Sequence, residues 1–395
     1  MPRQDISGRD HDLVLYGATG FVGALTAAYL ARHAPADCRW ALAGRSTAKL
    51  ERLRAQLAAV NPACAELPLL RADSAAPETL HALAAGTRVL ATTVGPYLLH
   101  GEPLVAACAA AGTDYLDLTG EPEFVDRMYL RHDAAARASG ARLVHACGFD
   151  SVPYDLGVHY TVGLLPEGVP LRIDGFVRTN GRFSGGTLAS ALTAVARPAA
   201  MARVARARRR SEPPLVGRTV RAPFGPPVRN RDTRTWGVPL PTLDPRIVAR
   251  SAAALDRYGP DFRYRHYAGV RRLPTALAGV VGATAVSALA QVPAARRWLS
   301  GRLQPGEGPS PQRRARSRFA VRFAASGGGA HLVTEVAGGD PGYDETAKML
   351  AEAALSLAFD DLPETAGQVT TAVAMGDALI RRLQDAGITF RVVRR

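Results

Sequence analysis

The sequence predicts an α/β protein, with an N-terminal doubly wound parallel sheet followed by a second α+β domain. Residues 12–146 alternate short apolar runs with amphipathic helical patterns, and a glycine-rich turn follows the first run. After Pro153 this rhythm gives way to longer strand patterns and long helices. A length of 395 residues suits two domains, and a hydrophobic content of 47% is enough for packed cores.

The first part is expected to hold six strands, and strands that alternate with helices at this spacing form a Rossmann-type sheet. We assign it to residues 1–150. Pro68 weakens the assignment of the third strand, because proline cannot donate a ladder hydrogen bond. The expected strands are residues 13–16, 40–43, 67–70, 88–93, 115–118 and 142–146, and the expected helices are residues 22–33, 47–59, 101–111 and 122–139.

The second part is expected to be a substrate domain over residues 151–365, with a basic, Ala-rich helical insertion at 190–315. Residues 366–395 should form a helix and a strand that pack back on the first domain. Residues 211–245 are rich in Pro, Gly and Arg and predict a loop. The remaining patterns predict strands at 171–179, 317–325 and 330–337, the last two joined as a hairpin, and helices at 190–210, 343–359 and 371–386.

The net charge of +14 is carried almost entirely by arginine, since Lys49 and Lys348 are the only lysines. Residues 197–318 contain 25 arginines against six acidic residues. Such a basic block predicts an anionic partner surface, either an acidic carrier protein or an anionic membrane; a solvated face is the alternative. It has few aromatic residues for base stacking and no nucleic-acid-binding motif, which argues against nucleic acid.

The uncharged run at residues 273–295 is long enough to span a bilayer, but it is rich in alanine and poor in large apolar side chains. An interfacial or substrate-lining helix and a buried Ala-rich core helix are the alternatives. Residues 1–12 are polar and charged, and the four cysteines form no CxxC pair. We therefore expect no metal site and a cytoplasmic enzyme, with peripheral attachment to the plasma membrane as an open alternative.

The turn after the first strand predicts a dinucleotide site. Gly17 allows the tight turn, Gly20 lets a pyrophosphate approach the helix N-terminus, and Gly23 lets the helix pack close to the sheet. The expected cofactor-binding residues in this turn are Gly17, Thr19, Gly20, Phe21, Val22 and Gly23.

The end of the second strand decides between NADH and NADPH. An NAD site places an acid there, whereas this sequence has Arg45 and Ser46, which can bind a 2′-phosphate. We therefore predict NADPH. Asp73, after the third strand, either contacts the adenine amine or caps the next helix.

Three further loops, at residues 93–101, 117–121 and 147–153, lie at the expected carboxyl edge of the sheet, where ligands bind in such folds. Thr93, Gly95 and Pro96 should shape a turn beside the nicotinamide ribose. Tyr97 and His100 follow them and can donate protons. Asp150 follows the sixth strand and is expected to orient the loop or the substrate.

Several motifs together resemble the saccharopine-dehydrogenase-like oxidoreductases, specifically the trans-acting enoyl reductase subfamily. They are YGATGFVG at 16–23, AGRS at 43–46, VGPY at 94–97, CGFDSVP at 147–153, FSGGT at 183–187 and GDPGY at 339–343. The resemblance implies NADPH-dependent reduction of a C=C bond in a lipid or polyketide-type acyl thioester. For that reaction Tyr97 or His100 would stabilise the enolate oxygen or supply the proton.

Two other functions remain open at this point. The wider family includes dehydrogenases acting at C–N bonds of amino acids, and a non-catalytic NADPH-binding scaffold at a membrane or synthase would share the same glycine turn. The sequence does not fix the oligomeric state, so a homo-oligomer also remains open.

Overall fold

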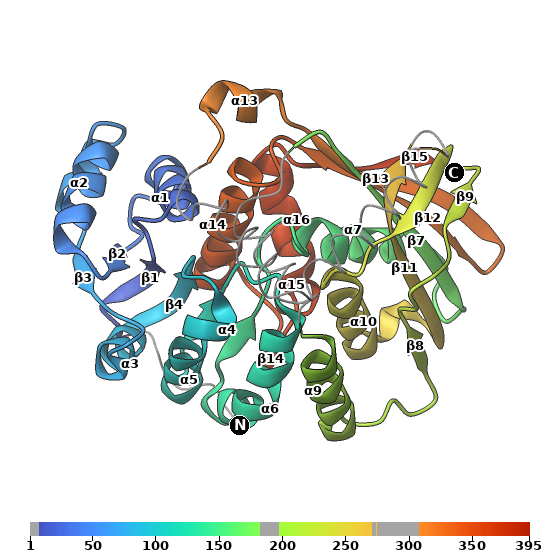
Figure 1. Cartoon of the computed structure of the whole chain (residues 1–395), viewed down its shortest axis with the longest axis horizontal. Coiled ribbons are helices and arrows are strands. Elements are labelled where there is room, and N and C mark those ends of the chain that lie inside the picture. The colour runs from blue at the N-terminus through green and yellow to red at the C-terminus, as the bar shows by residue number, and fades with distance from the viewer. Residues whose placement is uncertain (1–7, 182–196, 271–273, 275–307) are drawn as a thin grey trace.

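The computed structural model describes residues 8–181, 197–270, 274 and 308–395. These residues form two β-sheets with helices packed between and around them (Figure 1). The predicted α/β class, with a parallel first sheet and a second α+β part, is confirmed, and the second sheet proves to be mixed. The motif at 183–187 and nearly all of the uncharged run at 273–295 lie outside the described residues.

The first sheet has seven strands in the order β14-β6-β5-β4-β1-β2-β3, and every pair in it is parallel. The central strands are buried apolar runs, as expected for a sheet covered on both faces. The bounds are β1 (His11–Tyr16), β2 (Trp40–Gly44), β3 (Leu69–Arg71), β4 (Thr87–Thr92), β5 (Asp114–Leu116), β6 (Arg142–Val144) and β14 (Gly367–Val369).

Helices cover both faces of this sheet. One face carries α1 (Phe21–His33), α2 (Thr47–Ala58) and α14 (Asp344–Phe359); the other carries α3 (Pro77–Ala85), α5 (Glu102–Ala111) and α6 (Pro122–Ser139). The sequence reading missed α3. It also placed α14 in the second domain, whereas this helix packs against α1, β1, β4 and β5.

The second sheet follows the order β15-β13-β12-β7-β11-β10-β9, with β8 paired to β11. The predicted hairpin is confirmed: β12 and β13 pair antiparallel, and Gly328 and Gly329 form its turn with φ of 55° and 82°. The bounds are β7 (Leu171–Thr179), β8 (Thr219–Arg221), β9 (Val228–Asn230), β10 (Thr235–Pro239), β11 (Asp261–Val270), β12 (Phe319–Gly327), β13 (Ala330–Gly338) and β15 (Thr389–Arg394).

The basic middle of the chain is more ordered than the sequence predicted. The expectation of a loop over residues 211–245 is wrong in part, because three short strands form there and pair with β11 or with each other. Strand β11 and helix α7 (Val152–Gly163) were not predicted at all. Helix α10 (Asp244–Ala254) packs on α7 and β11, while α9 (Pro198–Ser211) packs on α6. Short helices occur at α4 (Tyr97–His100), α13 (Pro311–Arg316), η1 (Pro62–Glu66) and η2 (Asp256–Tyr258).

The C-terminal segment connects the two sheets. β14 adds an edge strand to the first sheet, whereas β15 pairs with β13 of the second sheet instead of returning to the first. Between them lie α15 (Thr371–Ala374) and α16 (Gly376–Asp385), which pack on α7 and α14. A continuous apolar core therefore extends from β1 and β2 through α14 and α7 to β12 and β13. In the described part of the chain, no helix is long and apolar enough to cross a membrane.

Helix α7 packs closely against the second sheet at one of its glycines, Gly157. A Cβ at Gly157 would lie 2.4 Å from Cε2 of the buried Phe323 and 2.9 Å from Cγ2 of Val336. Gly157→Ala is expected to destabilise the protein by about 1–3 kcal/mol in urea unfolding, because the core has no room for the methyl group.

Gly163→Ala is the matched control at the end of the same helix, where an added Cβ meets nothing within 4 Å. It should be neutral or stabilising by up to about 1 kcal/mol, because alanine favours the helix. Equal effects of the two substitutions would contradict this account of the contact.

Candidate dinucleotide and catalytic site

The glycine turn between β1 and α1 brings three backbone segments into close contact. Gly17 has a φ of 83°, and its N–H donates to the carbonyl of Ala43 at 2.9 Å. A Cβ at Gly23 would lie 2.2 Å from the Gly17 oxygen, so only glycine fits there. Thr93 at the end of β4 donates its hydroxyl to the same Gly17 carbonyl at 3.0 Å.

The N-terminus of α1 is left open by this turn. Thr19 and Gly20 are exposed, Phe21 and Val22 are half-buried, and Gly20 caps the helix without any side-chain hydrogen bond. The first turn of α1 contains no acidic residue. Free N–H groups at a helix N-terminus without competing negative charge are suited to bind a pyrophosphate.

Arg45 and Asp73 follow the carboxyl ends of β2 and β3, and the charges of both act on Tyr16. Burial raises the pKa of Tyr16; the charge of Asp73 adds to this shift and that of Arg45 opposes it. Arg45 is exposed, free to meet a phosphate. Ser46 caps α2 by accepting from the Lys49 N–H at 3.4 Å, and Asp73 accepts from the Ala75 N–H at 3.0 Å. This bond closes a turn within the loop and does not cap α3, whose N-cap is Ala76 without a side-chain hydrogen bond. The helix-cap alternative for Asp73 is therefore wrong, and the adenine contact stays a prediction.

The loop after β4 is fixed by a buried glutamate. Glu121 accepts hydrogen bonds from the N–H groups of Tyr97 at 3.1 Å and Leu98 at 2.9 Å, which are the first two residues of α4. Gly95 and Pro96 precede them, are exposed, and are joined by a cis peptide bond. The sequence placed Gly95 and Pro96 beside the nicotinamide ribose, and the structure puts them at the carboxyl end of β4, next to the glycine turn.

The sequence suggested Tyr97 as a proton donor, whereas in the structure its hydroxyl is hydrogen-bonded to backbone groups. Its ring is 6% exposed, and its hydroxyl donates to the Thr92 carbonyl at 3.2 Å while accepting from the Leu118 N–H at 3.1 Å. Burial raises its pKa well above the ordinary value. This geometry favours a role in joining the ends of β4 and β5 over one as a proton donor. His100, at the end of α4, is exposed.

A second buried carboxylate holds the loops after β5 and β6. Asp117 accepts from the Tyr115 hydroxyl at 2.9 Å and from the N–H groups of Thr119 at 3.0 Å and Ala146 at 2.9 Å. Its Oδ2 also lies 2.6 Å from Nδ1 of His145. A buried carboxylate needs such partners to offset its lost hydration, so these loops are held in one arrangement.

Asp150 is part of the loop after β6, at the carboxyl edge of the sheet. A Cβ at Gly120, in the loop after β5, would be 3.2 Å from Oδ2 of Asp150. Burial raises the pKa of the Asp150 carboxyl to about 6. The structure therefore brings Asp150 to the same edge as the glycine turn, with a protonation equilibrium close to neutral pH.

The second sheet contributes acid–base groups that the sequence reading missed. Asp244 begins α10, and its Oδ2 lies 3.6 Å from Nε2 of His266 on β11. Burial raises the pKa of Asp244 well above its ordinary value, and the charge of Asp150 adds to this effect. Burial also lowers the pKa of His266 to about 3, so its imidazole is neutral and Nδ1 meets the Tyr264 hydroxyl at 2.9 Å.

These groups face Asp150 from a different part of the chain. The ring of Tyr154 on α7 packs edge-on against His266, with ring centroids 4.7 Å apart. Burial raises the pKa of Tyr154, and the charges of Asp244 and Asp150 add to this rise. Leu243-Asp244-Pro245 carried the signal of a helix start, but nothing local in the sequence connects Asp244 to Asp150.

The residues present fit NADPH. The tight turn, the open helix N-terminus and the exposed Arg45 match a pyrophosphate and a 2′-phosphate, as the sequence predicted. Among the described residues, no cluster of three or more His, Cys, Asp or Glu side chains is placed to hold a metal ion.

Comparison with known families identifies the first domain. Residues 13–144 match the family model described as "Saccharopine dehydrogenase NADP binding domain". These residues contain the glycine turn, Arg45 and the loop with Tyr97. NADP is thus the cofactor of this domain type.

Relatives extend the similarity over nearly the whole chain. A trans-acting enoyl reductase from Mycobacterium tuberculosis is 37% identical, and the alignment covers 98% of each chain. The Mycobacterium leprae enzyme of the same name is also 37% identical, with the same coverage. A third relative, from Mycobacterium tuberculosis and provisionally given this name, is 42% identical over 98% of each chain.

The fold is also found among solved structures. The apo saccharopine dehydrogenase (L-Glu forming) from Saccharomyces cerevisiae superposes with a TM-score of 0.55 over 96% of this chain and 99% of its own. Its sequence is only 12% identical, so the likeness extends to the fold alone.

Arg45 should decide the choice between the two nicotinamide cofactors. Arg45→Ala is expected to weaken NADPH binding about 10- to 100-fold, because one charge-assisted contact to the 2′-phosphate is lost. NADH binding should change by less than about twofold, since NADH lacks that phosphate. Titration calorimetry with both cofactors measures the difference.

Arg52→Ala on the exposed side of α2 provides the matched control for lost charge and should leave both affinities unchanged. Equal loss of NADPH and NADH binding in Arg45→Ala would assign Arg45 a structural role instead.

Proposed function

The chain belongs to the family of trans-acting enoyl reductases, and on that premise we propose that it reduces the C=C bond of a lipid or polyketide-type acyl thioester. The observation that carries this proposal is Asp150: a carboxyl with a raised pKa lies at the same sheet edge as the NADPH-binding turn. NADPH, when bound, supplies the hydride.

The reaction requires two things of the protein. Hydride addition at the β-carbon leaves negative charge on the thioester oxygen, and the α-carbon must then receive a proton. A carboxyl with a pKa of about 6 can give up a proton near neutral pH, which an ordinary aspartate cannot do as readily. We therefore assign Asp150 as the proton donor, acting directly or through water.

The other candidates take supporting roles in this proposal. Asp244 and the neutral His266 adjoin Asp150, and burial raises the pKa of Asp244 well above its ordinary value. The raised pKa of Asp150 itself comes from burial. Tyr97 positions the loops after β4 and β5, and exposed His100 remains a second candidate donor.

A direct assay tests the reaction itself. NADPH oxidation is measured with an α,β-unsaturated acyl thioester, and the saturated thioester is identified by mass spectrometry. Turnover is expected with the thioester. Consumption of an amino acid with NADP⁺, and none of the thioester, would instead indicate a C–N dehydrogenase. Tight NADPH binding without turnover of either substrate class would indicate a scaffold.

Asp150→Asn tests the assigned proton donor. The wild-type rate is expected to fall as pH rises through about 6, because Asp150 must be protonated to act and its raised pKa sets that point. In Asp150→Asn the rate should fall by about 10²- to 10⁴-fold and lose this pH dependence. The readout is kcat between pH 5 and 8 at saturating NADPH.

Asp361→Asn is a suitable control, because Asp361 lies in the exposed segment after α14, away from these loops. Wild-type rates and an unchanged pH profile in Asp150→Asn would remove this residue from the mechanism.

We further propose that the substrate is presented by an acidic carrier protein or at an anionic membrane surface, as part of lipid assembly. The arginine-rich block supports this, since Arg203, Arg206, Arg209 and Arg210 are exposed on α9. Binding in either case should weaken steeply with salt. Flotation with anionic liposomes at low salt separates the membrane from the carrier protein.

A further inference from the structure

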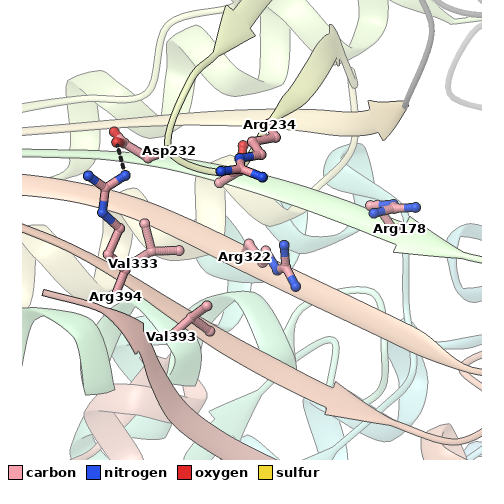
Figure 2. A pocket seen from close by; sticks show the side chains of 8 residues that line it. Arg178, Asp232, Arg234, Arg322, Val333, Val393 and Arg394 are labelled. Atoms are coloured by element: carbon pink, nitrogen blue, oxygen red, sulfur yellow. Dashed lines mark hydrogen bonds and ion pairs between the residues drawn. The ribbon is translucent and has the colours of Figure 1, made fainter.

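The second sheet contains a cavity that plays no part in the site described above. It has a volume of about 650 Å³, which is within the range of small-molecule sites. β7, β12, β13, β15 and the turn between β9 and β10 supply its walls. The lining residues are Arg178, Asp232, Thr233, Arg234, Arg322, Val333, Val393 and Arg394 (Figure 2).

Four arginines and one aspartate line this cavity. Asp232 pairs with Arg394 at 3.0 Å, and Glu335 accepts from Nε of Arg322 at 2.7 Å. Glu335 also binds Arg391, so a single carboxylate serves two guanidinium groups. Burial raises the pKa of Glu335, but the hydrogen bonds from Arg322 and Arg391 outweigh it and hold the pKa below its ordinary value.

Two of the lining guanidinium groups keep free hydrogen-bond donors. Among the described residues, Arg322 uses its Nε alone, and the side chain of Arg234 has no hydrogen-bond partner. In Figure 2 the side chains of Arg234 and Arg322 lie near the centre of the view, and Arg178 lies apart from them along the sheet. Clustered cations with free N–H donors attract an oxyanion that can accept from several of them.

The backbone conformation at Arg234 also indicates that its side chain has a specific use. Its φ is 52°, a left-handed conformation in which glycine or asparagine is usual. The turn is set by Asn230, whose Oδ1 accepts from the Thr233 N–H at 2.9 Å and the Thr233 hydroxyl at 3.1 Å. An arginine at a position that suits glycine is consistent with a use for its side chain.

The cavity lies far from the NADPH site. Figure 1 shows β9, β12 and β15 at the opposite end of the molecule from α1 and α2. None of the lining residues belongs to the glycine turn or to the loops around Asp150. Val333 and Val393 add an apolar wall, which suits a ligand that has hydrocarbon next to its charged group.

We propose that this cavity is a second ligand site, which binds a small molecule carrying a phosphate group beside a short apolar segment. The planar guanidinium forks match phosphate oxygens in pairs. Such a phosphate belongs either to a prosthetic arm on a carrier protein or to a free phosphorylated metabolite. The proposal does not rest on the reductase activity, because it concerns binding at separate residues.

Calorimetry on the full chain tests the site, with NADP⁺ at saturation so that phosphate cannot enter the dinucleotide site. Pyrophosphate and 4′-phosphopantetheine are the probes, and pantetheine without phosphate is the negative control. One site is expected, with binding that weakens as salt rises. Tighter binding of 4′-phosphopantetheine than of pyrophosphate indicates the prosthetic arm; the reverse order indicates a free phosphorylated metabolite.

Arg234→Gly is the decisive variant, because glycine suits the φ of this position and the fold should be kept or slightly stabilised. It is expected to weaken probe binding about tenfold or more. Arg231→Ala, in the same turn but outside the lining, should retain wild-type affinity within about twofold. Absence of binding in the wild type, or equal affinities in all three proteins, would overturn the proposal.

Discussion

The arrangement of the loops at the carboxyl edge of the first sheet depends on the hydrogen bonds of Asp117. Its buried carboxylate joins the Tyr115 hydroxyl, the Thr119 and Ala146 N–H groups and His145, and so fixes two loops to one point. Glu121 does the same for the start of α4. Ion burial is tolerated only with such a full set of donors, and the loops that present Asp150 and Gly120 are therefore rigid relative to the glycine turn.

The acid–base residues near this edge come from both sheets. The first sheet supplies the cofactor edge and Asp150, while the second sheet and α10 bring up His266 and Asp244, which are too deeply buried to ionise easily. Helix α7 starts directly after Asp150 and runs into the apolar core beneath β12 and β13. The position of Asp150 is thus set by packing in both layers.

The sequence predicted those features that depend on neighbours along the chain. The βα alternation, the glycine turn and Arg45 after the second strand are all encoded within short windows. Strand β11 was missed because its arginines and aromatic residues alternate with little aliphatic content, and α3 because nine residues give a weak periodicity. The arrangement of Asp150, Asp244 and His266 depends on tertiary packing. The hydrogen bonds of the Tyr97 hydroxyl to the backbone of β4 and of the loop after β5 likewise cannot be read from sequence.

The late position of β14 in the chain has a consequence for biosynthesis. The ribosome completes β1 to β6 long before residues 367–369, so the nascent first sheet leaves the β6 edge without its partner strand. The apolar surface that α14 covers on β1 and β4 is likewise bare until residues 344–359 emerge. The first sheet is therefore completed only once residues 344–369 have been synthesised, and chaperones can bind the exposed strands in the interval.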